Sequence, residues 1–143
     1  MNGSAPFEER HVLKLGGGSQ GTIGGSTFHQ MTNEEKTRSF SFSAFGLHTD
    51  GFHALPANQR GAVDRKLETD LWGTDVKFDW LAAPGLVIEP KVSYYTEDRC
   101  NGTELAENST DALDLSLRVT SDEGDFSWQA LGWYQRRELE SVF

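Results

Sequence analysis

Residues 72–80 read Trp-Gly-Thr-Asp-Val-Lys-Phe-Asp-Trp, and they alternate larger, mostly apolar residues with glycine or charged residues. Successive side chains of a β-strand point to opposite sides, so this segment predicts a strand with one apolar face and one charged face. Tryptophan stands at both ends of the apolar face. The segment also approaches the roughly 9–11 residues that a tilted strand needs to cross a bilayer. This combination is typical of the wall of a transmembrane β-barrel.

Similar alternation recurs along the chain between short turns rich in glycine and polar residues. It predicts an all-β fold, an antiparallel up-and-down meander of about seven strands that forms a partial transmembrane β-barrel. Pro90 weakens the fifth strand, because proline has no N–H to donate to a neighbouring strand. The strands are expected at residues 10–17, 22–31, 37–48, 72–80, 86–98, 111–121 and 126–137.

The connections between these predicted strands differ in length in a regular way. Long or medium polar connections, at 49–69 and 99–110, alternate with short turns such as Ala83-Pro84-Gly85. Outer-membrane barrels have short turns at one end and longer loops at the other. A soluble meander has no reason for such an asymmetry.

Composition narrows the class of protein further. The chain has 143 residues, enough for one domain, and its net charge of −9 argues against nucleic-acid binding. The mean hydropathy of −0.53 excludes a helical membrane protein. A barrel remains compatible with it, since half of each strand then faces a polar interior.

The N-terminal segment Met1–Arg10 lacks the basic start and apolar stretch of a secretory signal. Because an outer-membrane protein must be exported, we expect this sequence to be a piece of a longer chain. Residues 1–9 are expected to form a tail and residues 10–143 the barrel portion. Cys100 is the only cysteine and cannot form an internal disulfide, so a passive loop thiol is expected.

No pattern of catalytic, cofactor-binding or metal-ligating residues stands out, so we predict a protein that is not an enzyme and has no cofactor. The histidines, His11, His29, His48 and His53, show no spacing that places two ligands on one strand face. The carboxylates Asp75, Asp79, Glu89 and Asp114 are expected to pair with Lys77, Lys91 and Arg118, or to face a plug. An exposed acidic turn is expected at Asp122, Glu123 and Asp125 rather than a calcium site.

Aromatic residues near the predicted strand ends fit the interface belts of membrane barrels, and the alternative is a sandwich core. They are Trp72, Trp80, Tyr94, Trp128 and Tyr134. If a ligand is touched, the loops at 49–69 and 99–110 are the candidates, with Arg60, Asp64 and Arg99 as possible contacts for an anionic or chelated ligand.

Several segments, taken in order, resemble the first part of the barrel of TonB-dependent outer-membrane receptors. The first is Leu15-Gly16-Gly17-Gly18-Ser19-Gln20-Gly21-Thr22, and the next is residues 41–52, Ser-Phe-Ser-Ala-Phe-Gly-Leu-His-Thr-Asp-Gly-Phe. Arg60-Gly61-Ala62-Val63-Asp64 follows, then Arg99-Cys100-Asn101-Gly102-Thr103 and Asn108-Ser109-Thr110. The last is residues 126–136, Phe-Ser-Trp-Gln-Ala-Leu-Gly-Trp-Tyr-Gln-Arg.

The resemblance covers the chain from about residue 10 and rests on the order and spacing of these segments. It implies about the N-terminal third of a barrel in the bacterial outer membrane, without the plug. The whole receptor would import a scarce ligand, such as an iron–siderophore complex or cobalamin. The implied partners are outer-membrane lipid, the plug and remaining barrel, TonB through a region absent here, and that small-molecule ligand.

The alternative interpretation is a soluble, secreted β-sandwich that binds carbohydrate through surface aromatic residues. The two interpretations differ in strand length and in the medium that covers the apolar faces.

Overall fold

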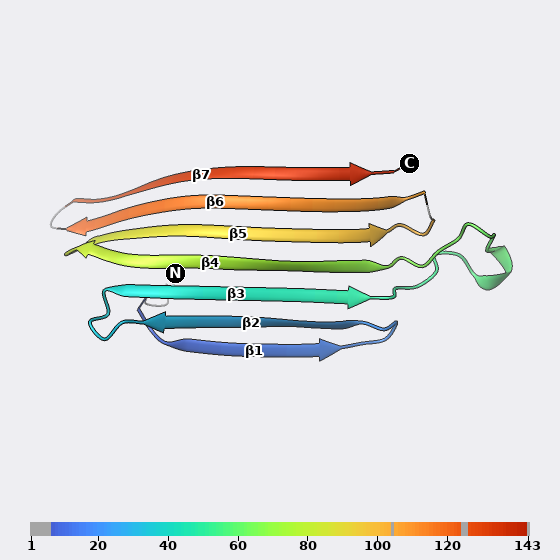
Figure 1. Ribbon diagram of the computed structural model, residues 1–143, viewed down its shortest axis with the longest axis horizontal. Coiled ribbons are helices and arrows are strands. Elements are labelled where there is room, and N and C mark those ends of the chain that lie inside the picture. Colours follow the sequence, from blue (N-terminus) through green and yellow to red (C-terminus); the bar gives the residue numbers. More distant parts are fainter. Residues whose placement is uncertain (1–6, 104, 124–125, 143) are drawn as a thin grey trace.

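The computed structural model describes residues 7–103, 105–123 and 126–142. Seven antiparallel strands form one sheet in which each strand lies beside its neighbours in sequence, in the order β1 to β7 (Figure 1). The predicted up-and-down meander of seven strands is thereby confirmed. The strands are β1 (Arg10–Gly17), β2 (Ile23–Thr32), β3 (Arg38–Thr49), β4 (Thr69–Ala83), β5 (Leu86–Cys100), β6 (Glu107–Glu123) and β7 (Phe126–Ser141).

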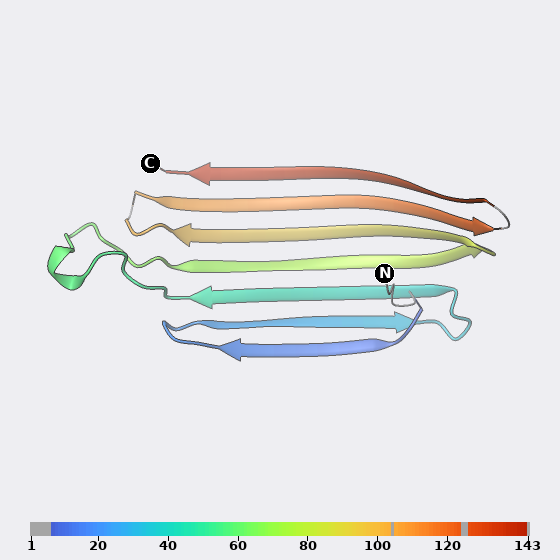
Figure 2. The same ribbon diagram turned by 180° about the vertical axis from the view of Figure 1, so that it is seen from behind.

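The two ends of the sheet carry different connections. The β1–β2, β3–β4 and β5–β6 connections lie at one end, which we call the loop end. The β2–β3 and β4–β5 connections lie at the other end, the turn end, where β6 ends and β7 begins (Figures 1 and 2). The β3–β4 connection spans residues 50–68 and extends well beyond the strands, with a short 3-10 helix at Ala57–Gln59. The predicted asymmetry between the two ends is present in the fold.

The last four strands are longer than the sequence predicts. β6 begins at Glu107 rather than at residue 111, and β7 continues to Ser141 rather than ending at 137. The β5–β6 connection therefore contains only residues 101–106, and the expected loop over 99–110 was too long. Polar residues such as Asn108 and Glu140 belong to strands because their backbones pair with a neighbour.

Two prolines show how the hairpin between β4 and β5 is built. Gly85 has φ +71°, which the second central position of a type II turn requires. Pro84 precedes it and suits the first central position of the same turn. Pro90 lies inside β5 and pairs with Leu117 of β6. On its other side, the ladder with β4 is interrupted between Lys77 and Trp80. A proline is thus accommodated where one strand-to-strand pairing is broken.

The sheet has almost no hydrophobic core of its own. Among the described residues, Ala112 is the only buried apolar residue. No helix in the described part of the chain is long and apolar enough to span a membrane. The sheet is a single open layer, so its apolar side chains lie uncovered.

Candidate lipid-facing surface

The apolar side chains predicted for separate strands share one face of the sheet. The strand register places Phe42, Val76, Val92 and Leu115 opposite one another across β3 to β6. We call this the apolar face, and the opposite face, which carries Asp75 and Lys77, the polar face. The apolar face predicted from alternation in residues 72–80 is confirmed by this register.

Large side chains on the apolar face remain exposed. Trp72 keeps 52% of its surface accessible, Leu117 48% and Trp80 40%. Large exposed apolar side chains that lie side by side normally mark a surface that contacts another protein or a membrane. The apolar face is therefore a surface that something must cover.

The apolar residues form a band that crosses the sheet obliquely. At the loop end, Trp72 lies opposite Thr96, two residues nearer the loop end than Tyr94. Tyr94 lies in the same cross-strand row as Arg136, two residues nearer the loop end than Tyr134. The aromatic boundary thus moves about four residues toward the turn end from β4 to β7.

The opposite boundary moves in the same direction. The row that contains Trp80, Ile88, Val119 and Ala130 is apolar on β4 to β7 but reaches the charged Arg38 on β3. On β7 the apolar series continues further toward the turn end, to Trp128 and Phe126. Both boundaries shift by a little more than one residue per strand.

This shift has a direct geometric meaning. With about 3.4 Å per residue and about 4.8 Å between strands, it inclines the band by about 40° from the perpendicular to the strands. The band lies parallel to a membrane plane when the strands tilt by that angle from the membrane normal. Strands of membrane barrels tilt by about 35–45° from the barrel axis. An isolated water-exposed sheet gives no reason for such an offset.

The height of the band also fits a bilayer. On β4 it runs from Trp72 to Trp80, about 27 Å along the strand, or a little over 20 Å when tilted by about 40°. The outward apolar band of outer-membrane barrels is about 25 Å tall. β4 to β7 are longer than the band and extend beyond it.

An aromatic pair marks the loop-end boundary of the band. The rings of Trp72 and Tyr94 lie 5.2 Å apart, and the Tyr94 hydroxyl donates a hydrogen bond to Asp111 Oδ1 at 2.6 Å. Each ring thus joins the apolar band while the tyrosine oxygen reaches the polar side chains beyond it. Amphipathic aromatic residues take this position at membrane–water interfaces.

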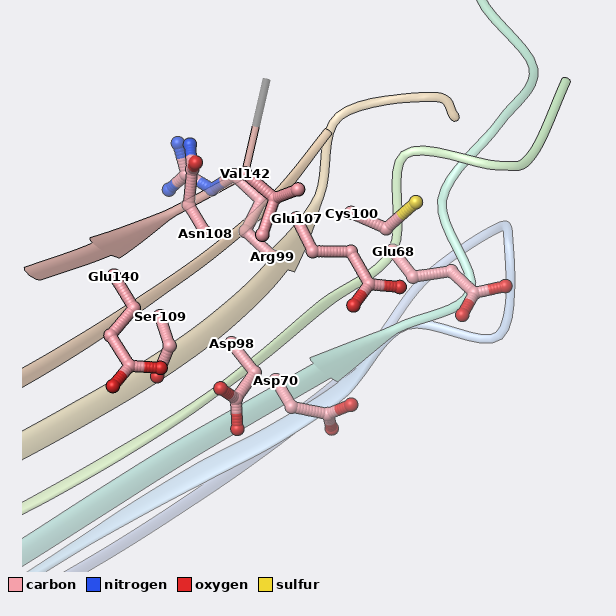
Figure 3. A pocket seen from close by; sticks show the side chains of 10 residues that line it. All are labelled: Glu68, Asp70, Asp98, Arg99, Cys100, Glu107, Asn108, Ser109, Glu140 and Val142. Carbon is pink, nitrogen blue, oxygen red and sulfur yellow. The ribbon is translucent and has the colours of Figure 1, made fainter. Parts of the chain in front are cut away.

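Beyond this boundary the same face becomes acidic. Figure 3 shows Asp70, Asp98 and Glu140, from β4, β5 and β7, at the loop end among the residues that line a pocket. Asp70 and Asp98 are paired across β4 and β5. His48 lies opposite Asp70, and its Nδ1 lies 2.6 Å from Asp70 Oδ1. Hydrogen bonds to Asp70 and then Asp50 raise the pKa of His48 above its ordinary value.

The polar face carries a network of hydrogen bonds and ion pairs centred on Asp75. Its carboxylate accepts hydrogen bonds from Ser43 of β3 at 2.9 Å and Ser93 of β5 at 2.6 Å. Lys91 Nζ lies 2.8 Å from Asp75 Oδ1. Three strands are joined through one carboxylate.

A second group of charges lies nearer the turn end. Lys77 Nζ is 2.9 Å from Asp79 Oδ1 and 3.8 Å from Glu89 Oε1, and Arg118 Nη1 is 3.7 Å from Glu89 Oε2. Asp79 is fully buried, and neither of its oxygens has an aligned hydrogen bond, so Lys77 is its charge partner. The predicted pairing of carboxylates with Lys77, Lys91 and Arg118 is confirmed for Asp75, Asp79 and Glu89. Asp114 Oδ1 is buried and has no hydrogen-bond partner in the described structure, and the alternative that such a carboxylate faces a plug stays a prediction.

The histidines are less isolated than the sequence indicates. His11 and His29 lie directly opposite each other on β1 and β2, although they are 18 residues apart in sequence. Spacing along one strand gives no sign of this pair, because only the register brings it together. The described residues contain no group of three or more histidine, cysteine or acidic side chains that could hold a metal ion.

The loop residues considered as ligand contacts are engaged within the protein. Arg60 Nε donates to the Leu55 carbonyl at 2.8 Å, Asp64 accepts from the Gly61 amide, and Arg99 pairs with Glu97. The 50–68 and 101–106 loops also pack together, since the Arg65 amide donates to the Gly102 carbonyl at 2.8 Å.

Two further predictions concern single residues near the connections. Cys100 is partly buried at the end of β5, where its thiol lies 3.6 Å from the Thr103 carbonyl oxygen, so it is a strand residue rather than a loop residue. Of the expected acidic turn, Asp122 and Glu123 end β6, and Asp125 lies outside the described residues.

Comparison with protein-family models, curated proteins and solved structures finds no significant match for this chain.

Proposed function

We propose that this sheet is part of the wall of a transmembrane β-barrel, with its apolar face in lipid and its polar face toward the interior. The oblique apolar band is the observation that carries the proposal. Its inclination equals the tilt that barrel strands adopt in a membrane, and its height approximates that of a barrel's outward apolar band. The aromatic boundary at Trp72 and Tyr94 and the acidic residues beyond it support the same placement.

The alternative, a soluble sandwich that binds carbohydrate, has less support. A sandwich covers the apolar face of each sheet with a second sheet about 10 Å away. The described residues form one layer, and strands of 15–17 residues from β4 to β7 exceed the usual length of sandwich strands. Lipid therefore fits the uncovered face better than a second protein layer does.

At a finer level, we propose that the barrel is that of a TonB-dependent receptor of the bacterial outer membrane. The proposal rests on the ordered resemblance of residues 15–22, 41–52, 60–64, 99–103, 108–110 and 126–136 to that family. The charged network on the polar face suits contact with water or a plug, and the extended 50–68 loop suits the outer surface. The whole receptor would then import a scarce ligand, such as a siderophore complex, with energy supplied through TonB.

Two tryptophans of β7 provide a test of the lipid-facing assignment. Trp128 lies on the apolar face and Trp133 on the polar face of the same strand. Variants that keep only one of these tryptophans, with the other three replaced by Phe, can be refolded into vesicles containing lipid brominated along its acyl chains. Quenching of Trp128 should exceed that of Trp133 at least twofold. Equal quenching of both residues, or none of either, would contradict the proposal.

Uptake measurements test the receptor assignment separately. Disruption of the encoding gene should abolish TonB-dependent uptake of one radiolabelled ferric chelate or corrinoid, while passive permeability to small sugars stays unchanged. Unchanged uptake across such a panel would refute the receptor assignment, and the lipid-facing assignment would still stand on the quenching result.

A further inference from the structure

Two imidazole rings face each other across the β1–β2 pair. His11 Nδ1 and His29 Nδ1 are 3.0 Å apart, and the ring centroids are 5.3 Å apart. Both side chains are exposed, and they lie on the apolar face in the cross-strand row of Phe42 and Val76.

The nitrogen–nitrogen distance matches that of a chelate. Metal–imidazole bonds of about 2.0–2.1 Å place two nitrogens about 2.9 Å apart at a right angle and about 3.4 Å apart at the tetrahedral angle. The observed 3.0 Å lies within this range, so the two nitrogens already have the spacing that one shared ion requires. Each ring must turn so that its Nδ1 lone pair points toward the ion.

Thr27 contacts the other ring nitrogen of His29. Its hydroxyl donates toward the Val12 carbonyl at 3.4 Å and lies 2.7 Å from His29 Nε2. A hydroxyl has one hydrogen, so when Thr27 donates to Val12 it accepts a hydrogen bond from His29 Nε2–H. In that neutral tautomer, Nδ1 of His29 carries a lone pair and faces Nδ1 of His11. Metal-binding histidines are commonly held by such a bond at the other ring nitrogen.

We propose that His11 and His29 form a two-histidine site for a divalent transition-metal ion, with Thr27 as a positioning residue. Imidazole suits Cu²⁺, Ni²⁺ and Zn²⁺, and Cu²⁺ is expected to bind most tightly. Binding requires each ring to carry its proton on Nε2, so that both Nδ1 atoms are free for the ion. Water fills the remaining coordination positions. The site requires only the β1–β2 hairpin. In the proposed barrel, the shift of the apolar band toward the loop end from β7 to β1 places the row of His11 and His29 at the turn-end boundary of the band, where water is available.

Titration of the full-length, detergent-folded chain with CuCl₂ tests the site. Isothermal calorimetry should show one site, and replacing either histidine (His11→Asn or His29→Asn) should weaken it at least tenfold. Thr27→Val should weaken it by a smaller factor, about 3- to 10-fold. His53→Asn is the matched control and should leave the affinity within twofold, because His53 lies in the 50–68 loop.

A second measurement avoids dependence on the folding of variants. Electron paramagnetic resonance of the unmodified protein with one equivalent of Cu²⁺ should show two coordinated imidazole nitrogens. One imidazole only, or affinity unchanged in both His11→Asn and His29→Asn, would overturn the proposal. Loss of affinity in His53→Asn equal to that in His11→Asn would also overturn it.

Discussion

The apolar and polar faces of the central strands differ in how far the protein itself satisfies their side chains. On the polar face, Asp75 contacts Ser43, Ser93 and Lys91, and Asp79 is buried beside Lys77. On the apolar face, Trp72 and Trp80 keep about half or somewhat less of their surface exposed. The two faces belong to the same strands. Substitutions on one face and on the other can therefore be compared, to test whether the apolar face needs lipid while the polar face is stabilised by contacts within the protein.

The largest expected effect comes from a charge in the middle of the apolar band. Val92→Arg should destabilise the lipid-embedded chain by about 2–4 kcal/mol, the cost of arginine at the bilayer midplane. Gln135→Arg is the control, because residue 135 is on the polar face opposite Asp114. Denaturant unfolding in vesicles measures both. Equal destabilisation by the two variants would mean that the faces do not differ in their surroundings.

Removal of the charge partner of Asp79 tests the polar face. Lys77→Met leaves a buried carboxylate uncompensated, and the cost should be about 2–3 kcal/mol because Lys77 is partly exposed; fully buried pairs cost about 3–5 kcal/mol. The double variant Lys77→Met/Asp79→Asn removes both charges and should recover most of this stability in the same unfolding measurement. Absence of recovery would show that Lys77 acts through packing instead.

Substitution of two glycines, one on each face, compares how tightly the two faces are packed. A Cβ at Gly73 on the polar face would lie 2.7 Å from the Phe45 ring and 3.0 Å from the Tyr94 carbonyl oxygen, whereas Gly132 on the apolar face has nothing within 4 Å. Gly73→Ala should cost about 1–2 kcal/mol through overpacking. Gly132→Ala should be neutral or slightly stabilising. The prediction fails if thermal unfolding midpoints fall equally in both variants.

The smallest effect concerns pH and the region beyond the apolar band. The raised pKa of His48 means that its pairing with Asp70 and Asp50 contributes stability fully below pH 6.5. That contribution disappears as pH rises through the higher folded-state pKa. The stability difference between the parent chain and His48→Gln should therefore shrink between pH 6 and pH 8.5. An NMR titration of His48 with a midpoint at or below 6.5 would contradict this account.

Much of the fold follows from local alternation, because the two-residue period of a strand is written directly in residues 72–80. The same alternation recurs in β5 and β6, and the register places their apolar residues on the same face. Strand ends are harder to predict: Asn108 and Glu140 carry no apolar signal, and only pairing with a neighbour makes them strand residues. The His11–His29 pair and the oblique band both depend on register between strands, which the sequence of one strand does not contain.

The order of the strands has a topological consequence. With seven strands alternating in direction, β1 and β7 point the same way (Figure 1). Joining these two free edges directly would create a parallel seam, unlike the other six pairings. A cylinder with only antiparallel neighbours can therefore be completed only by an odd number of additional strands between β7 and β1.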